Sequence, residues 1–238
     1  MGVLREFKVF ISSRGLFRNW FFSGIKYYLI KYGLINGKIT VGFGCDDDRM
    51  YVLNPRVYVY MVSAYYDGLF KLVCDGGLVG RFFDVIDLVH RDGEFLLRMP
   101  DGILLTIDSF DPLIIPETWL YDIHFLGFDL SDWFVLDIGA FVGDTALYYA
   151  RRGAFVVAVE PLSSNYEVML RNLELNPELK PRIVPVNVAV NGGDGFVVRY
   201  NVAVDGGASA HGMGRFVAKV RSMRLSTLIR ELENREAC

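Results

Sequence analysis

The sequence predicts an α/β protein whose C-terminal half contains a parallel, doubly wound sheet. Three continuous apolar runs, WFVLDIG, FVVAVE and RIVPVNVAV, have the composition of strands that are buried on both faces. Two helical patterns, DTALYYARRG and SSNYEVMLRNLELN, alternate with these runs, and a glycine-containing turn, GAFVG, joins the first strand to the first helix. Strands that alternate with helices in this way form parallel sheets covered by helices.

The chain is expected to contain two domains: a mixed α/β N-terminal region over residues 1–112, with no assigned role, and the parallel-sheet domain over residues 113–238. Apolar side chains recur at helical spacing within residues 7–35 and predict one or two amphipathic helices. Strands are then predicted for KITVGF, RMYVLN and RVYVYMVS, a short helix for GLVGRFFDVIDLVHRDG, and a hairpin for EFLLRM and ILLTI around a PDG turn. CDDDR is predicted to be a solvated turn rather than a metal site.

Further elements flank the parallel sheet of the second domain. Pro116 is predicted to open a helix with Glu117 in its first turn, and Ser163 or Ser164 is expected to cap the second helix of the sheet. After the third strand, FVVRYNVAV and RFVAKVRSM predict a pair of strands around the glycine-rich turn DGGASAHGMG. LSTLIRELENRE predicts a last amphipathic helix.

The charge of the chain is unevenly distributed. The net charge is −3, but residues 1–40 hold seven Lys or Arg and one acidic residue, so the remainder is acidic. The acidic body disfavours nucleic-acid binding, because phosphate contacts need Lys and Arg. The basic, aromatic-rich segment 7–35 has two interpretations: helices packed on the body of the protein, or peripheral contact with an anionic membrane surface.

The cysteines and the apolar segments bear on the cellular location. Cys45, Cys74 and Cys238 are widely separated and form no CxxC pair, so the sequence predicts neither a disulfide scaffold nor a structural zinc site. A reducing compartment is then the default, and a cytoplasmic protein is expected. Lys26 and Lys31 interrupt the apolar stretch NWFFSGIKYYLIKYGLI, so no membrane-spanning helix is predicted.

The turn after the first parallel strand is the expected ligand site, because such sheets bind ligands at the carboxyl ends of their strands. Gly139 lets the chain leave the strand, and Gly143 is expected to let the loop backbone approach a ligand. Asp144 or Thr145 is expected to cap the following helix. Phe141 stands where the dinucleotide fingerprint needs glycine, which argues against a pyrophosphate.

Two carboxylates and one amide lie at the ends of the three strands. Asp137 would repel a phosphate and suits a cationic ligand, such as the sulfonium and amino group of S-adenosylmethionine. Glu160 ends the second strand, where an acidic side chain accepts hydrogen bonds from ribose hydroxyls. Asn187 ends the third strand and is expected to bind an adenine edge. In this order and spacing the residues predict an S-adenosylmethionine site.

The run DIGAFVGDTALYYARRGA…VVAVEPLSSNYEVMLRNLELN resembles the FkbM-like methyltransferases, a class I S-adenosylmethionine-dependent family. The likeness covers about residues 117–230 and includes the D-x-G-A-x-x-G-D-T loop, the E-P pair and an N-x-x-x-N at Asn172 and Asn176. The resemblance implies a Rossmann-like sheet and methyl transfer to a sugar, polyketide or other small-molecule hydroxyl. The expected cofactor-binding set comprises Asp137, Gly139, Ala140, Phe141, Gly143, Asp144, Thr145, Glu160, Pro161 and Asn187.

The sequence departs from the family at two places. Phe141 stands where the family often has Asn. The family also continues with a strand of the type D-x-L-K-I-D-x-E-G-x-E, so a sheet that is incomplete at its C-terminal side is expected here. Three functions follow: a small-molecule or glycan O-methyltransferase, which is favoured, an RNA methyltransferase, or a non-catalytic subunit that needs a complementary chain or oligomer. No general base is assigned, and His211 is only a weak candidate.

Overall fold

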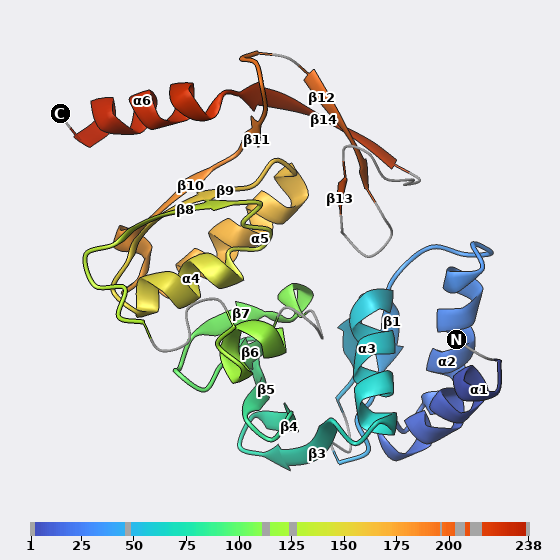
Figure 1. Ribbon diagram of the computed structural model, residues 1–238. Coiled ribbons are helices and arrows are strands. Elements are labelled where there is room, and N and C mark those ends of the chain that lie inside the picture. Colours follow the sequence, from blue (N-terminus) through green and yellow to red (C-terminus); the bar gives the residue numbers. More distant parts are fainter. Residues whose placement is uncertain are drawn as a thin grey trace. The chain divides into compact units, whose positions relative to one another are not determined.

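The computed structural model describes residues 3–45, 49–110, 115–123, 128–195, 197–202, 208–209 and 216–236 (Figure 1). The chain divides into two units, Met1–Pro112 and Leu113–Cys238, and each is described by itself. Within the described residues, every helix is too short or too polar to cross a bilayer. The triple aspartate of CDDDR and the loop around His211 lie outside these ranges.

The first unit begins with helices, as predicted: where one or two were expected within residues 7–35, the structure has two α-helices, α1 and α2. They approach each other closely at Gly24, where a Cβ atom would lie 2.2 Å from the Phe10 ring. Both helices are drawn in blue at the N-terminal end of the chain in Figure 1. The helical elements of this unit are α1 (Val3–Ser12), η1 (Ser13–Gly15), α2 (Trp20–Lys31) and α3 (Pro55–Tyr66).

Helix α3 corrects one expectation, because RVYVYMVS was predicted to be a strand. The Asn54 side chain accepts a hydrogen bond from the Val57 N–H at 2.7 Å, and Pro55 occupies the first helical position. These are strong helix-start signals. They outweigh the β-propensity of the valines and tyrosines, and one face of the helix is buried through Val57, Tyr58, Met61, Val62 and Ala64.

The strands of the first unit form two antiparallel sheets. The short pair joins β1 (Ile39–Val41) and β2 (Tyr51–Leu53), as predicted. The larger sheet has the order β3-β4-β5-β6-β7, so each strand pairs with its neighbour in sequence. Its strands are β3 (Phe70–Asp75), β4 (Leu78–Phe82), β5 (Ile86–Arg91), β6 (Glu94–Arg98) and β7 (Leu104–Thr106), and η2 (Ile107–Ser109) follows.

The predicted helix over GLVGRFFDVIDLVHRDG is wrong, because this segment forms the β4–β5 hairpin. Phe83 and Asp84, at its turn, have φ angles of 52° and 62°. Two successive residues with positive φ reverse the chain as a tight hairpin turn does and end any helix. The hairpin of β6 and β7 around the PDG turn is confirmed.

The expectation that the cysteines form no disulfide is also wrong. Cys45 and Cys74 are joined by a disulfide, with their Cα atoms 6.0 Å apart. Cys45 follows β1 and Cys74 lies in β3, so a sequence separation of 29 residues hid a close approach in space. A reducing compartment was expected because no cysteine pair was predicted, and the cytoplasmic location stays a prediction.

The second unit has the predicted Rossmann-like α/β arrangement. Its parallel sheet has the order β10-β9-β8, with Asp137 opposite Ala158 and Val186 opposite Val159. Helices α4 and α5 lie on one face and α6 on the other (Figure 1), where Leu228 packs on Val157 and Val159. These elements are η3 (Pro116–Leu120), β8 (Phe134–Ile138), α4 (Asp144–Arg151), β9 (Phe155–Val159), α5 (Ser163–Glu174), η4 (Lys180–Arg182), β10 (Ile183–Val186) and α6 (Leu225–Glu236).

A second sheet of the order β11-β14-β12-β13 follows. Strands β12 and β14 form the predicted antiparallel pair, and β11 joins β14 in parallel. The strands are β11 (Ala189–Val190), β12 (Val197–Val202), β13 (Ala208–Ser209) and β14 (Phe216–Met223).

Among the described strands, β8 forms one edge of the parallel sheet. Phe134 and Ile138 on β8 are 57% and 51% exposed. Parallel sheets are normally covered on both faces, so this edge leaves unusual apolar surface in solvent.

Candidate functional site

The carboxyl ends of β8 and β9 meet at the turn formed by residues 139–143. The N–H groups of Gly139 and Ala140 both donate to the Val159 carbonyl, at 2.8 and 3.0 Å. The Ala140 carbonyl accepts from the Gly143 N–H at 2.7 Å, just before α4 begins. The backbone therefore fixes this turn directly against the end of β9.

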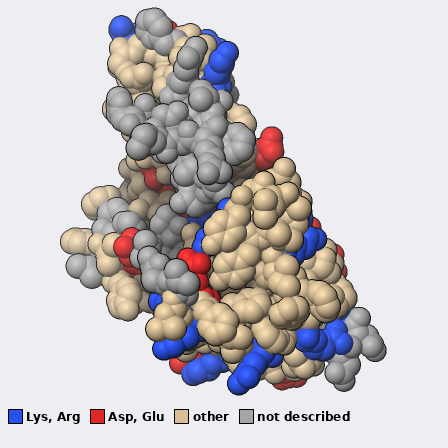
Figure 2. Space-filling view, turned by 90° about the vertical axis from the view of Figure 1, so that its right-hand side faces the viewer, with Lys and Arg blue, Asp and Glu red and all other residues tan. Residues whose placement is uncertain are grey.

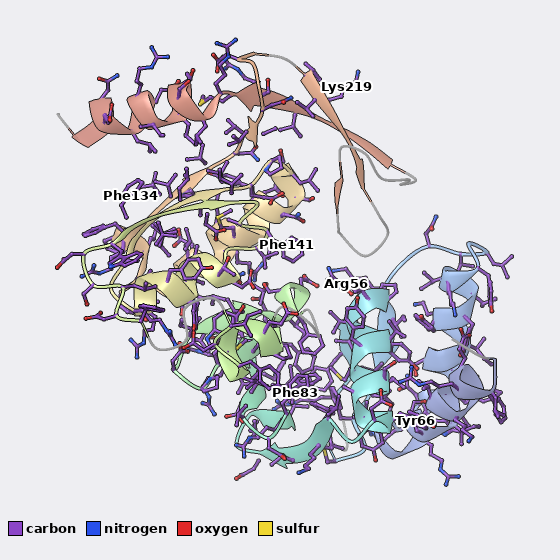
Figure 3. The ribbon with its side chains drawn as sticks, in the orientation of Figure 1. Arg56, Tyr66, Phe83, Phe134, Phe141 and Lys219 are labelled. Atoms are coloured by element: carbon purple, nitrogen blue, oxygen red, sulfur yellow. A yellow bond between two sulfur atoms is a disulfide. The ribbon has the colours of Figure 1, made fainter. Side chains whose placement is uncertain are left out.

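Three residues of the turn have left-handed backbone conformations. The φ angles of Gly139, Phe141 and Gly143 are 90°, 49° and 75°. For Phe141, labelled in Figure 3, this conformation costs of order 1–2 kcal/mol, since only glycine adopts it freely. Its N–H donates to the Glu160 Oε2 atom at 3.0 Å, and this bond helps to hold the strained residue in place.

The two glycines of the turn have different surroundings. A Cβ atom on Gly139 would meet nothing within 4 Å, so this backbone faces open space. A Cβ atom on Gly143 would lie 2.6 Å from the Met169 Cγ atom on α5. Gly139 thus leaves backbone accessible to a ligand, whereas Gly143 permits close packing of the turn on α5.

Glu160 is 5% exposed and organises the end of β9. Its Oε1 atom accepts from the Leu162 N–H at 2.9 Å and from the Asn165 amide at 3.3 Å. Leu162 is the N-cap residue of α5, so Glu160, rather than the predicted Ser163 or Ser164, satisfies a donor at the start of this helix. Burial raises the pKa of the Glu160 carboxyl above its ordinary value, against the opposing effect of these hydrogen bonds.

Asp137 and Asp144 add two further carboxylates at the same end of the sheet. Thr145 donates its hydroxyl to the Asp137 Oδ2 atom at 2.7 Å, which links β8 to the first turn of α4. Asp144 is 3% exposed and is the first residue of α4, while Gly143 occupies the N-cap position. Burial, together with the charges of Asp137 and Asp144, raises the pKa of Tyr149 to about 12. These acidic groups disfavour a phosphate at the turn.

Asn187 links the ends of β9 and β10. Its amide donates to the carbonyls of Glu160 and Pro161 at 2.8 and 3.2 Å, and its Oδ1 atom accepts from the Ser163 hydroxyl at 3.2 Å. The side chain that was expected to bind adenine is therefore engaged within the chain. Of the remaining predicted residues, Ala140 is buried and Pro161 is half-buried.

Two residues that support the turn and α4 were not predicted as site residues. Asn172 on α5 is fully buried and donates to the Val142 carbonyl at 2.8 Å, so it holds the turn from behind. The N-x-x-x-N pattern was the available signal, and Asn176 in turn donates to the Asn172 carbonyl at 2.7 Å. Before β8, Asp122 accepts hydrogen bonds from Tyr148 and Arg152, which anchors the preceding segment on α4.

Of the comparisons with known proteins, only the one with solved structures found similar chains. No protein-family model matches the chain, and no curated protein matches it. The chain is similar to the structure of Pyrococcus horikoshii TYW2 in complex with MeSAdo, with a TM-score of 0.31, 18% identity, and 61% of this chain and 55% of that chain covered. It is also similar to a SAM-dependent methyltransferase from Agrobacterium tumefaciens, with a TM-score of 0.29, 19% identity, and 63% and 49% covered. The match spans about half the length of these proteins.

Proposed function

We propose that the second unit binds S-adenosylmethionine and serves methyl transfer to a small-molecule or sugar hydroxyl. The observation that carries the proposal is the open backbone at Gly139. Gly139 follows Asp137 by two residues, and its N–H donates to the carbonyl of Val159, the residue before Glu160. The motif that resembles FkbM-like methyltransferases supplies these same residues.

The negative charge of the acidic side chains at this site suits a positively charged cofactor. The carboxylates of Asp137, Asp144 and Glu160 lie at this end of the sheet and favour a ligand that carries positive charge and hydroxyl donors. Asp137 and Glu160 would hold the cofactor, with the Gly139 backbone beside it. When bound, S-adenosylmethionine supplies an activated methyl group on its sulfonium. The role of the chain would then be to bind the cofactor and to orient the methyl acceptor against it, since the cofactor carries the reactive group.

Isothermal titration of the folded full chain with S-adenosylmethionine tests the proposal. We expect micromolar binding, and a loss of at least about tenfold in Asp137→Asn, because one charge-assisted contact contributes about 1.5–3 kcal/mol. Glu167→Gln is the matched control, since Glu167 is an exposed acidic residue of α5. Absence of binding by the folded wild type, or equal affinity in wild type and Asp137→Asn, would contradict this site.

The acceptor is tested by a separate assay. Transfer of radiolabelled methyl groups to sugar and polyketide hydroxyls is expected, and transfer to RNA instead would favour the alternative class. The acidic body weighs against RNA.

The exposed edge of β8 favours a second candidate function, that of a subunit completed by another chain. Phe134 and Ile138 offer apolar surface, and β8 offers an unpaired strand edge within the described sheet. Light scattering distinguishes the two candidates: a monomer that binds cofactor and transfers methyl groups alone would exclude an obligate partner.

A further inference from the structure

Helix α1 has an apolar face turned to solvent. Leu4 and Phe7 are 69% and 60% exposed, and half-buried Ile11 continues the series at helical spacing. Val9 on the opposite face is buried, and the ring of Phe10, at the border of the two faces, packs against Gly24 of α2. The exposed side chains are therefore the outer face of a helix whose inner face is already used for packing.

Helix α2 presents a matching outer face. Phe21, Phe22 and Ile25 are 49%, 74% and 40% exposed. Tyr32, the C-cap residue two turns beyond Ile25, is 67% exposed. The ring centroids of Phe10 and Phe21 are 6.3 Å apart, so the two helices lie side by side. We refer to the outer side chains as the α1/α2 apolar face, and they comprise Leu4, Phe7, Ile11, Phe21, Phe22, Ile25 and Tyr32.

Basic side chains surround this face. Lys8 lies on α1 and Lys26 on α2, and exposed Arg14 and Arg18 follow α1 in the chain. Figure 2 shows a broad uncharged area bordered by Lys and Arg on the side where these helices lie. Seven Lys or Arg and a single acidic residue occur in residues 1–40, so the segment is strongly positive although the whole chain has a charge of −3.

We propose that the α1/α2 apolar face docks on a membrane surface that contains anionic lipids, with both helices lying in the plane of the interface. Exposed aromatic and aliphatic side chains enter the headgroup boundary, and the surrounding Lys and Arg contact lipid phosphates and carboxylates. A second copy of the chain is disfavoured as the occupant, because it would bring an equally positive face against this one. This proposal is independent of the methyl-transfer proposal, since every residue it uses lies in the first unit.

Vesicle co-sedimentation of the full chain tests the inference. We expect binding to phosphatidylcholine vesicles that contain phosphatidylglycerol, weak binding to phosphatidylcholine alone, and release as salt is raised. Lys8→Gln and Lys26→Gln are each expected to weaken binding about fivefold, the effect of one basic residue near an anionic surface. Phe7→Ser with Phe22→Ser should abolish it, whereas Phe128→Ser, which alters an equally exposed aromatic residue of the second unit, should not.

Tryptophan fluorescence provides the second measurement. The Trp20 and Phe21 rings lie 5.7 Å apart, so Trp20 adjoins the face. Brominated lipids should quench the wild type more strongly than Trp20→Phe. No binding to anionic vesicles, equal binding with and without phosphatidylglycerol, or equal loss in Phe128→Ser would overturn the proposal. Self-association of the wild type through this face without vesicle binding would overturn it as well.

Discussion

The two units cover their sheets to different extents. In the first unit, aromatic rings from β3, from β4 and from the segments that follow η1, β1 and η2 are buried in ring contacts. Phe17, Phe43, Phe70, Phe82 and Phe110 are each at most 2% exposed. In the second unit, α4, α5 and α6 cover much of the parallel sheet, but Phe134 on β8 stays 57% exposed. The first unit thus buries these five phenylalanines, although Phe7 and Phe22 on α1 and α2 stay exposed, while the second unit keeps apolar surface at a strand edge.

The largest expected effect tests this difference in burial between the two units. The Phe82 ring lies 4.4 and 4.5 Å from the rings of Phe70 and Phe110. Phe82→Ala should lower the free energy of unfolding by about 3–5 kcal/mol, because it opens a cavity in a packed core. Phe134→Ala should change it by no more than about 0.5 kcal/mol. Urea denaturation followed by circular dichroism measures both, and similar losses would show that β8 is covered in solution.

The next effect concerns the disulfide, which ties β3 of the first unit to the segment after β1. Cys45→Ser should lower the stability of the oxidised protein by about 3–4 kcal/mol, the loop-closure value for 29 residues. The thermal transition of the wild type in reductant should then match that of the variant. If the native, unreduced wild type showed two reactive thiols in addition to that of Cys238, the bridge would not form.

The smallest effect contrasts one carboxylate from each unit. Burial acts to raise the pKa of Asp87, but hydrogen bonds from Arg81 and Arg98, at 2.6 and 2.5 Å, outweigh it and hold the pKa below its ordinary value. Asp87 is expected to contribute about 1–2 kcal/mol to the free energy of unfolding, after allowance for two half-exposed arginines. This contribution is present above the unfolded pKa of about 3.9 and is lost as the pH falls through the folded pKa.

Glu160 should show the opposite sign. Its pKa is raised by burial, so stability falls as the pH rises from the unfolded value of about 4.3 through the raised folded value. Unfolding curves at a series of pH values should lose the acid-side slope in Asp87→Asn and the higher-pH slope in Glu160→Gln. Identical pH profiles for the two variants would contradict the contrast.

The two units also differ in how much of their secondary structure could be predicted from the sequence. The elements from β8 to β10 were predicted because continuous apolar runs separated by helical patterns are typical of parallel sheets, although β8 itself is partly exposed. The third run, RIVPVNVAV, was predicted as one strand but is divided between β10 and β11, which belong to different sheets. In the first unit, α3 has β-branched residues in a helix and β4–β5 has apolar residues in a hairpin, so local propensity misled there. Asn54 with Pro55 was the overlooked signal for α3.

At the site, the sequence predicted which residues stand at the strand ends better than it predicted their hydrogen-bond and packing partners. The sequence placed Asp137 and Glu160 at strand ends, and the structure has them there. The packing of Gly143 on Met169, the use of the Asn187 amide by two carbonyls, and the support of the turn by Asn172 depend on where α5 lies. Such contacts join residues 26 to 30 positions apart, so a local pattern such as N-x-x-x-N does not show which atoms will pair.

The double hydrogen bond from Gly139 and Ala140 to the Val159 carbonyl has a thermodynamic consequence. A loop that orders only around its ligand loses conformational entropy at the moment of association, and the observed affinity falls accordingly. Here the turn is already shaped by β9, Glu160 and Asn172, so that entropy is lost when the chain folds. A ligand bound at Gly139, as proposed, would meet a turn that the folded chain has already shaped, and its affinity would depend on the contacts it makes.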